Sequence, residues 1–213
     1  MISPSILTAD FLHLEDEIKM INKSEADLLH LDIMDGVYVP NLTFGFPVIR
    51  QIKSISEKPL DVHLMIVEPD RYLEAYRDAG ADWLTVHYET CTHLHRTIQN
   101  ITELGMKAAV AINPHTDVSL LEPVLGDLNM VLIMTVNPGF GGQKFIPQSY
   151  EKIRKLRKMI DDKGLSTLIQ IDGGVNENNI AALVEAGVDV FVAGNSVFAA
   201  DDPVAMISKL KAI

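Results

Sequence analysis

Two histidines and two aspartates stand inside three apolar runs of the sequence. His30 and Asp32 lie in LHLDIMDG, and His63 and Asp172 lie in PLDVHLMI and TLIQIDG. Alternate residues of a strand face opposite ways, so His30 and Asp32 share one face of the first run, opposite its leucines. If three strands present these groups at one end of a sheet, the mixed set of imidazoles and carboxylates suits a divalent transition metal such as Zn²⁺ or Fe²⁺.

Apolar runs rich in Val, Ile and Leu recur eight times along the chain and are typical of buried strands. Between them, apolar residues recur at spacings of three and four, as at Ile153, Leu156 and Ile160, which predicts helices. Eight strands that alternate with helices favour a closed (β/α)8 barrel over an open doubly wound sheet, in which about five or six strands are usual. The runs are ISPSIL from Ile2, LLHLDIM from Leu28, PLDVHLMI from Pro59, WLTVHY from Trp83, KAAVAI from Lys107, MVLIMTV from Met130, TLIQIDG from Thr167 and VDVFVAG from Val188.

The composition favours one domain. With 213 residues, 47% of them hydrophobic, the chain can bury a sizeable core, although that length also accommodates two small domains. No linker or low-complexity tract divides it, so we expect residues 1–213 to form a single α/β domain, a (β/α)8 TIM barrel. The sequence has no basic signal-type start and no apolar run long enough to span a bilayer, which predicts a cytoplasmic protein.

Charge and glycine content together point to an anionic substrate. The net charge of −11 argues against nucleic acid and anionic membranes as partners, and it means that an anion must be captured by local groups. Glycines follow three strands, in VNPGFGGQKF, DGGV and AGNS. Such residues let backbone N–H groups approach an anion, and the loops after strands seven and eight commonly bind phosphate on this fold. The loop after the sixth strand is also long enough to act as a lid.

Other polar residues have simpler interpretations. A strand histidine is more often a hydrogen-bonded core residue than a ligand, but the two-residue period alone leaves His87 open as a ligand. Asp35 fits a turn, and the lone Cys91 fits a packed thiol. The histidines that we expect on helices or loops, in solvent, are His13, His93, His95 and His115.

Five segments spread over essentially the whole chain are SPSILTADF, LHLDIMDGVYVPNLTFG, DVHLM, MTVNPGFGGQKF and IDGGV. In combination they resemble the ribulose-phosphate 3-epimerase family. The resemblance implies a metal-dependent barrel that interconverts D-ribulose 5-phosphate and D-xylulose 5-phosphate in the pentose phosphate pathway. It places His30, Asp32, His63 and Asp172 on the family's metal ligands and the two aspartates on its acid/base pair. His87 matches a family histidine that is not a ligand.

The same resemblance implies where the substrate binds. Ser5 matches a substrate-contacting serine, and Met34, Met65 and Met134 match the apolar wall of the active site. Where the family often has Gly-Ser after the eighth strand, this chain has Gly194-Asn195-Ser196, so a contact through a backbone N–H is kept and one through the side chain stays open. The expected substrate-binding residues are Ser5, His63, Gly139, Phe140, Gly141, Gly142, Asp172, Gly173, Gly174, Gly194 and Asn195.

The implied reaction explains the buried aspartates. Epimerisation removes a proton from C3 on one face, passes through an enediolate and returns a proton to the other face, which requires two acid/base groups. We expect Asp32 and Asp172 to serve the two faces, with one divalent ion, Zn²⁺ before Fe²⁺, Mn²⁺ or Co²⁺, stabilising charge on the C2 oxygen. Two alternatives stay open: a related ketose-phosphate 3-epimerase, such as one acting on allulose 6-phosphate, and a catalytically silent sugar-phosphate-binding barrel. We also expect a homo-oligomer.

Overall fold

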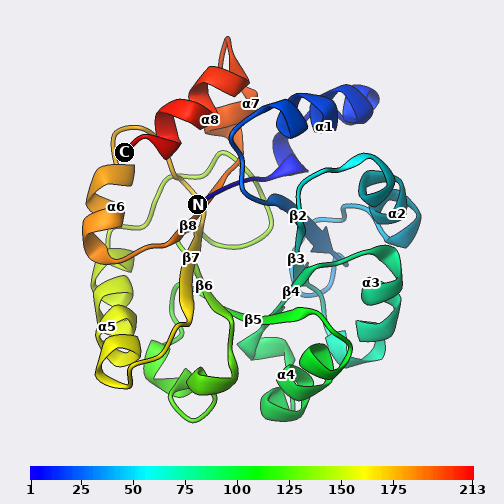
Figure 1. Cartoon of the computed structure of the whole chain (residues 1–213). Coiled ribbons are helices and arrows are strands. Elements are labelled where there is room, and N and C mark those ends of the chain that lie inside the picture. The colour runs from blue at the N-terminus through cyan, green and yellow to red at the C-terminus, as the bar shows by residue number, and fades with distance from the viewer.

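The computed structural model describes residues 1–213 and shows eight parallel strands ringed by helices (Figure 1). Each predicted apolar run contains one strand, which confirms the alternation of strands and helices. The strands are β1 (Ile2–Pro4), β2 (Leu29–Met34), β3 (Leu60–Met65), β4 (Trp83–His87), β5 (Lys107–Ile112), β6 (Met130–Met134), β7 (Leu168–Asp172) and β8 (Val190–Ala193). The helices are α1 (Leu14–Lys23), α2 (Phe46–Ile55), α3 (Leu73–Ala79), α4 (Leu94–Glu103), α5 (Ser149–Asp162), α6 (Ile180–Ala186), α7 (Asn195–Phe198) and α8 (Pro203–Lys211).

The strands form one nearly closed barrel. Neighbours pair in parallel in the order β1-β8-β7-β6-β5-β4-β3-β2. β1 and β2 meet through a single bridge between Ser5 and His30, because β1 is short and its Pro4 has no N–H to donate. The predicted (β/α)8 barrel is therefore confirmed.

Side chains that point into the barrel form layers along its axis, as is usual for this fold. Near the amino-terminal ends of the strands the layer is apolar and includes Trp83 and Met130. The next layer is polar and fully buried, and its members are hydrogen-bonded to one another: Ser3, His30, Asp61 and Gln170. A buried polar layer therefore follows the apolar one inside the barrel.

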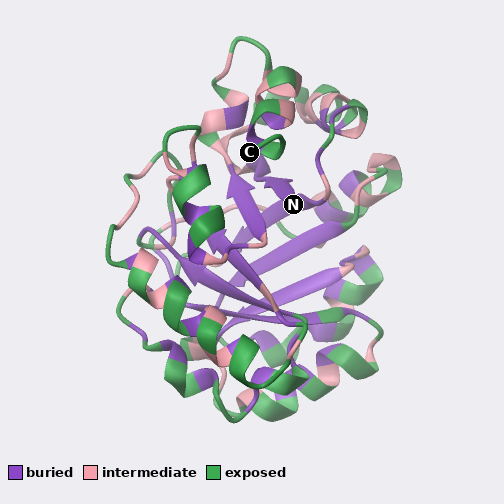
Figure 2. Cartoon of the chain, turned by 60° about the vertical axis from the view of Figure 1, so that its left-hand side comes forward, coloured by how far each residue is buried: buried purple, intermediate pink, exposed green.

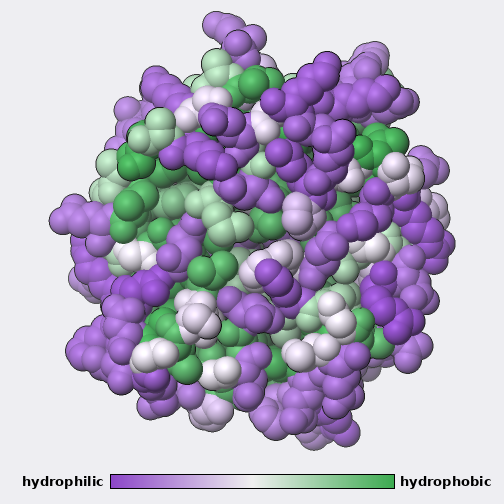
Figure 3. All heavy atoms as spheres, in the orientation of Figure 1, coloured by the Kyte–Doolittle hydropathy of each residue, from purple (hydrophilic) through white to green (hydrophobic).

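The main apolar core lies outside the barrel, between the strands and the helices. The strands are buried along most of their length, while the outer helix faces are exposed (Figure 2). On α5 the residues Ile153, Leu156 and Ile160 are all buried, as their spacing predicted. Hydrophilic residues cover most of the face seen in Figure 3. None of the helices has the length and apolar character needed to cross a membrane.

Candidate active site

The four polar residues on the inward faces of three strands meet at one point. β2 supplies His30 and Asp32, β3 supplies His63, and the end of β7 supplies Asp172. One nitrogen or oxygen atom from each lies within 4.8 Å of those from the other three. His30 Nε2 and His63 Nδ1 each lie 3.3 Å from Asp32 Oδ1. His63 Nδ1 also lies 3.8 Å from Asp172 Oδ2.

Burial and close contact shift the pKa values of these groups in opposite directions. Burial opposes ionisation of Asp32, but the imidazoles of His30 and His63 outweigh it and hold the pKa of Asp32 well below its ordinary range. Burial, together with the nearby carboxylate of Asp32, raises the pKa of Asp172 to about 7. Two carboxyl groups whose pKa values are pushed apart can serve as a base and an acid in one site.

The donor set fits a divalent transition metal. His30 Nε2 is buried next to Asp32 and has no hydrogen-bond partner. Buried polar atoms are rarely left without a partner, because their lost hydration is not replaced. Imidazole nitrogens and carboxylate oxygens are ordinary ligands of Zn²⁺ and of similar ions. The four residues could therefore hold one metal ion.

A cavity of about 410 Å³ opens at this cluster, a size typical of small-molecule sites. Asp32 and Asp172 line it, whereas His30 and His63 lie beneath it and are fully buried. A direct contact between His63 and the substrate stays a prediction. The other expected residues that line the cavity are Met34, Met65, Met134, Ser5, Gly139, Phe140, Gly141, Gly142, Gly173, Gly174, Gly194 and Asn195.

Glycines allow the loops around this cavity to approach one another closely. At Gly174, φ is +70° and a Cβ atom would lie 2.6 Å from the backbone nitrogen of Phe145. At Gly141 a Cβ atom would lie 2.5 Å from Thr8 Cγ2. A side chain at either position would push apart the loops that follow β1, β6 and β7.

Two hydroxyl groups that the sequence patterns did not single out also line the cavity. Thr8 Oγ1 and Ser196 Oγ are buried and have no hydrogen-bond partner. A Cβ atom on Gly194 would lie 3.1 Å from Thr8 Oγ1, so Thr8 and the start of α7 share one corner. Lys144 is the only cationic side chain among the lining residues. The hydroxyl groups in this corner are free to donate hydrogen bonds to an anionic group. Such local donors are needed because the net charge of the chain is −11.

The remaining polar candidates lie outside the four-residue cluster. His87 is fully buried, and its Nε2 lies 2.9 Å from His63 Nε2, on the side of that ring away from Asp32. Asp35 caps a turn, because its carboxylate accepts hydrogen bonds from the N–H groups of Val37, Tyr38 and Val67. The four histidines expected in solvent are exposed: His13, His93, His95 and His115.

Comparison with known proteins identifies the family of this chain. A sequence model of the ribulose-phosphate 3 epimerase family matches residues 1–198. The ribulose-phosphate 3-epimerase of Bacillus subtilis is 51% identical over 211 residues, which cover 99% of this chain and 97% of that protein. The chain belongs to the ribulose-phosphate 3-epimerase family. The resemblance seen in the sequence segments is therefore confirmed, and with it the expectation of an epimerase.

Other members of the family match over a similar span. The ribulose-phosphate 3-epimerase of Aquifex aeolicus is 46% identical over 100% of this chain and 96% of its own length. The chloroplastic ribulose-5-phosphate-3-epimerase of Arabidopsis thaliana is 46% identical over 100% of this chain and 76% of its own length.

Solved structures resemble the chain in fold alone. A tryptophan synthase alpha-subunit from Pyrococcus furiosus superposes with a TM-score of 0.74 at 14% identity, over 100% of this chain and 97% of that chain. A 3-hexulose-6-phosphate synthase superposes with a TM-score of 0.69 at 20% identity, over 99% and 98% of the two chains. Both likenesses support the barrel architecture.

Proposed function

We propose that this chain interconverts D-ribulose 5-phosphate and D-xylulose 5-phosphate by two-base proton transfer at C3. The observation that carries the proposal is the pair of carboxyl groups, Asp32 on β2 and Asp172 on β7, at the floor of one cavity. Family membership supports it, because relatives at 51% and 46% identity are named ribulose-phosphate 3-epimerase.

The positions of the two carboxyl groups suit an inversion at carbon. β2 and β7 are separated by β1 and β8 in the barrel, so Asp32 and Asp172 reach the cavity from different sides. A sugar between them would have one carboxylate near one face of C3 and one carboxylic acid near the other. In our assignment one aspartate takes the C3 proton while the other delivers a proton to the opposite face. The two residues exchange roles in the reverse reaction.

The same cluster would hold the metal ion. His30 and His63 would ligate it through Nε2 and Nδ1, the ring nitrogens that face Asp32, and the two aspartates would supply oxygen atoms. The chemistry that Zn²⁺, or alternatively Fe²⁺, Mn²⁺ or Co²⁺, supplies when bound is Lewis-acid stabilisation of negative charge on a substrate oxygen. Since both aspartates belong to the ligand set, substitutions at either position must be read together with metal content.

Apolar side chains bound the reacting part of the substrate. Met34, Met65 and Met134 line the cavity and are almost fully buried. Thioether side chains offer no hydrogen-bond donor to a developing enediolate and reduce the access of water to it. Stabilising the negative charge of the enediolate therefore depends on the polar groups at the cavity floor, where Asp32 and Asp172 lie.

We place the phosphate group in the corner of the cavity that Thr8 and the start of α7 share. Backbone N–H groups near Gly173 and Gly194, with the unpartnered hydroxyls of Thr8 and Ser196, can donate to phosphate oxygens. The loops after the seventh and eighth strands are the usual phosphate site of this fold. This corner gives a local means of anion capture in an acidic protein.

Steady-state kinetics with two sugar phosphates tests the proposal. Metal-replete protein should convert D-ribulose 5-phosphate with a higher kcat/KM than D-allulose 6-phosphate. The opposite order would assign the chain to the related hexulose phosphate reaction. Absence of turnover with both substrates, in protein shown to contain metal, would indicate a silent sugar-phosphate-binding barrel.

A further inference from the structure

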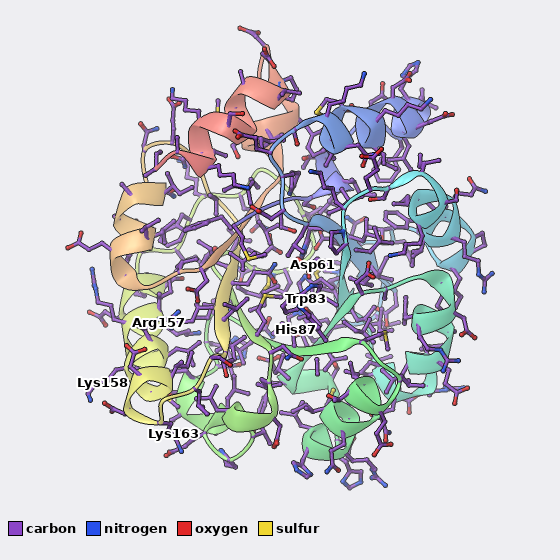
Figure 4. All side chains as sticks on the ribbon, in the orientation of Figure 1. Asp61, Trp83, His87, Arg157, Lys158 and Lys163 are labelled. Atoms are coloured by element: carbon purple, nitrogen blue, oxygen red, sulfur yellow. The ribbon has the colours of Figure 1, made fainter.

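Asp61 is a buried carboxylate that the proposed reaction does not use. It lies on β3, two residues before His63, and pairs in register with His30 on β2. Asp61 lies inside the ring of strands (Figure 4). Its side chain is 0% exposed to solvent. It does not line the cavity, so it cannot touch a substrate there.

Three donors from three other strands converge on one oxygen of Asp61. Oδ2 accepts hydrogen bonds from Gln170 Nε2 at 2.6 Å and from Ser3 Oγ at 3.1 Å. His30 Nδ1 lies 2.7 Å from the same oxygen. Its only ionic partner is the imidazole of His30, because no lysine or arginine lies within ion-pair distance.

A buried carboxylate at this position is not expected to increase the stability of the fold. Removing a carboxylate from water carries a penalty of several kcal/mol, and replacing a whole buried ion pair by apolar residues of similar volume is often neutral or stabilising. The cost suggests that Asp61 does something other than fill space.

The hydrogen bonds fix which nitrogen of His30 carries a proton. Asp61 Oδ2 accepts from Gln170 Nε2 and, as an oxygen of an ionised carboxylate, can only accept, so His30 Nδ1 donates to it. His30 Nε2 is then the atom left to bind a metal, and it is the atom that lies 3.3 Å from Asp32 Oδ1 without a hydrogen-bond partner. Orientation of a ligating histidine by a carboxylate on its other nitrogen is a recurrent device of metal sites.

The second histidine of the cluster presents the other ring nitrogen. His63 Nδ1 faces Asp32, and its Nε2 lies 2.9 Å from His87 Nε2. An imidazole can donate or accept at that contact, so His87 does not by itself set the tautomer of His63. Asp61 can only accept from His30. The hydrogen bond between His30 and Asp61 therefore has a fixed donor and acceptor, whereas the contact between His63 and His87 does not.

We propose that Asp61 is a positioning residue for the metal site: it holds the His30 ring in place and keeps Nε2 free to ligate. The inference rests on the proposed metal site of the epimerase. Asp61→Ala removes the acceptor and leaves His30 free to rotate or to change tautomer. Asp61→Asn keeps the shape and can place an amide oxygen where the three donors meet, but it removes the charge.

The test is a direct measurement of metal affinity in three folded variants. Apo protein is titrated with Zn²⁺ in competition with a coloured chelator, and the visible spectrum of the Co²⁺ form reports the ligand set. We expect Asp61→Ala to bind Zn²⁺ about 10–100-fold more weakly than the parent and to show an altered Co²⁺ spectrum. Asp61→Asn should lie between Asp61→Ala and the parent, as a partial rescue.

The matched control is Asp82→Ala. Asp82 Oδ2 accepts from the N–H of Leu60, at the start of the strand that carries Asp61, and from Lys53 Nζ. Its loss should lower the melting temperature without changing Zn²⁺ affinity. If Asp61→Ala does not fold, Asp61→Asn carries the comparison.

Two negative results have different meanings. Asp61 variants that bind Zn²⁺ as tightly as Asp82→Ala, with an unchanged Co²⁺ spectrum, would overturn the positioning role and leave the metal site standing. A parent protein that binds neither ion would overturn the metal site itself.

Discussion

At the scale of single residues, the acidic groups in and around the barrel differ in what they face. Asp32 and Asp172 line the cavity, whereas Asp61 is enclosed among strands. Glu89 follows β4 and binds the loop after β5, because it accepts from the Asn113 N–H and from the Thr116 hydroxyl. We therefore expect chemistry from the first pair, metal affinity from Asp61 and stability from Glu89.

Asp32→Asn and Asp172→Asn should each abolish net epimerisation. One remaining base cannot serve both faces of C3, although one variant can still exchange the C3 proton of a single epimer with solvent. The measurement is turnover in both directions together with metal content, because each aspartate is also a proposed ligand. Near-normal turnover in either metal-replete variant would refute the role given to that residue.

Glu89 should make the stability of the protein depend on pH. Burial opposes its ionisation, but hydrogen bonds from His87, Thr116 and the backbone of Asn113 outweigh it and lower the pKa of Glu89 to about 2, from an ordinary value of 4.5. A carboxyl group with a depressed folded pKa stabilises the protein above its unfolded pKa and loses that effect as pH falls towards the folded pKa. Glu89→Gln should cost roughly 1 kcal/mol at pH 7, because solvent screens a partly exposed carboxylate, and less as the pH falls from 4.5 towards 2.

Urea unfolding between pH 7 and pH 3 measures this difference. Glu103→Gln, on the exposed side of α4, is the control and should change the free energy of unfolding little at any pH. A difference between Glu89→Gln and the parent that does not depend on pH would contradict the assignment.

At the scale of elements, the strands position the cluster and the glycine-rich loops shape the cavity above it. Strand positions could be predicted because buried parallel strands read as apolar runs, and β5 occupies the predicted range, Lys107–Ile112. β1 is shorter than its run. The chain leaves the sheet after Ser5, whose hydroxyl accepts from the Leu7 N–H and caps a 3₁₀ helix over Ile6–Thr8. Such local capping has no signature in apolar periodicity.

A substitution at Gly194, just before α7, tests the proposed phosphate site. Gly194→Val would place a branched side chain next to Thr8 Oγ1, which lies 3.1 Å from the position of the new Cβ atom. The loss of two charge-assisted hydrogen bonds, at about 1.5–3 kcal/mol each, should lower kcat/KM by roughly 10²–10⁴. Competitive inhibition by inorganic phosphate should weaken in parallel, and metal content should stay at the parental level.

Gly126→Val is the matched control for this substitution. Gly126 lies in the turn before β6, away from the cavity, and a Cβ atom there would make only an ordinary contact with Leu165, at 3.8 Å. A folded Gly194→Val protein with the KM and phosphate inhibition of the parent would place the phosphate elsewhere.

At the scale of the whole molecule, the barrel brings together residues that are distant in the chain. The alternation of side chains along β2, β3 and β7 was enough to predict that His30, Asp32, His63 and Asp172 share an interior. The contact between Asp61 and Gln170, 109 residues apart, could not be predicted, because it depends on which strands face each other across the barrel. The same holds for the approach of Thr8, in the loop after β1, to Gly194, in the loop after β8.

The metal ion should stabilise the whole barrel as well as support turnover. A ligand that binds only the folded state adds about 2.7 kcal/mol of stability when its free concentration is 100 times its Kd. Removal of metal with a strong chelator should therefore lower the melting temperature and abolish turnover, and Zn²⁺, Fe²⁺, Mn²⁺ or Co²⁺ should restore both. Full activity in protein shown by elemental analysis to be metal-free would exclude the proposed metal site.

Incubation with D-ribulose 5-phosphate in D₂O, followed by NMR, tests the two-base assignment most directly. Each turnover removes the C3 proton to one aspartate and delivers a solvent-derived one from the other. The account predicts that D-xylulose 5-phosphate appears with deuterium at C3, and that Asp32→Asn and Asp172→Asn form none of it. Xylulose 5-phosphate that retains the original proton at C3 would contradict proton transfer by two separate residues.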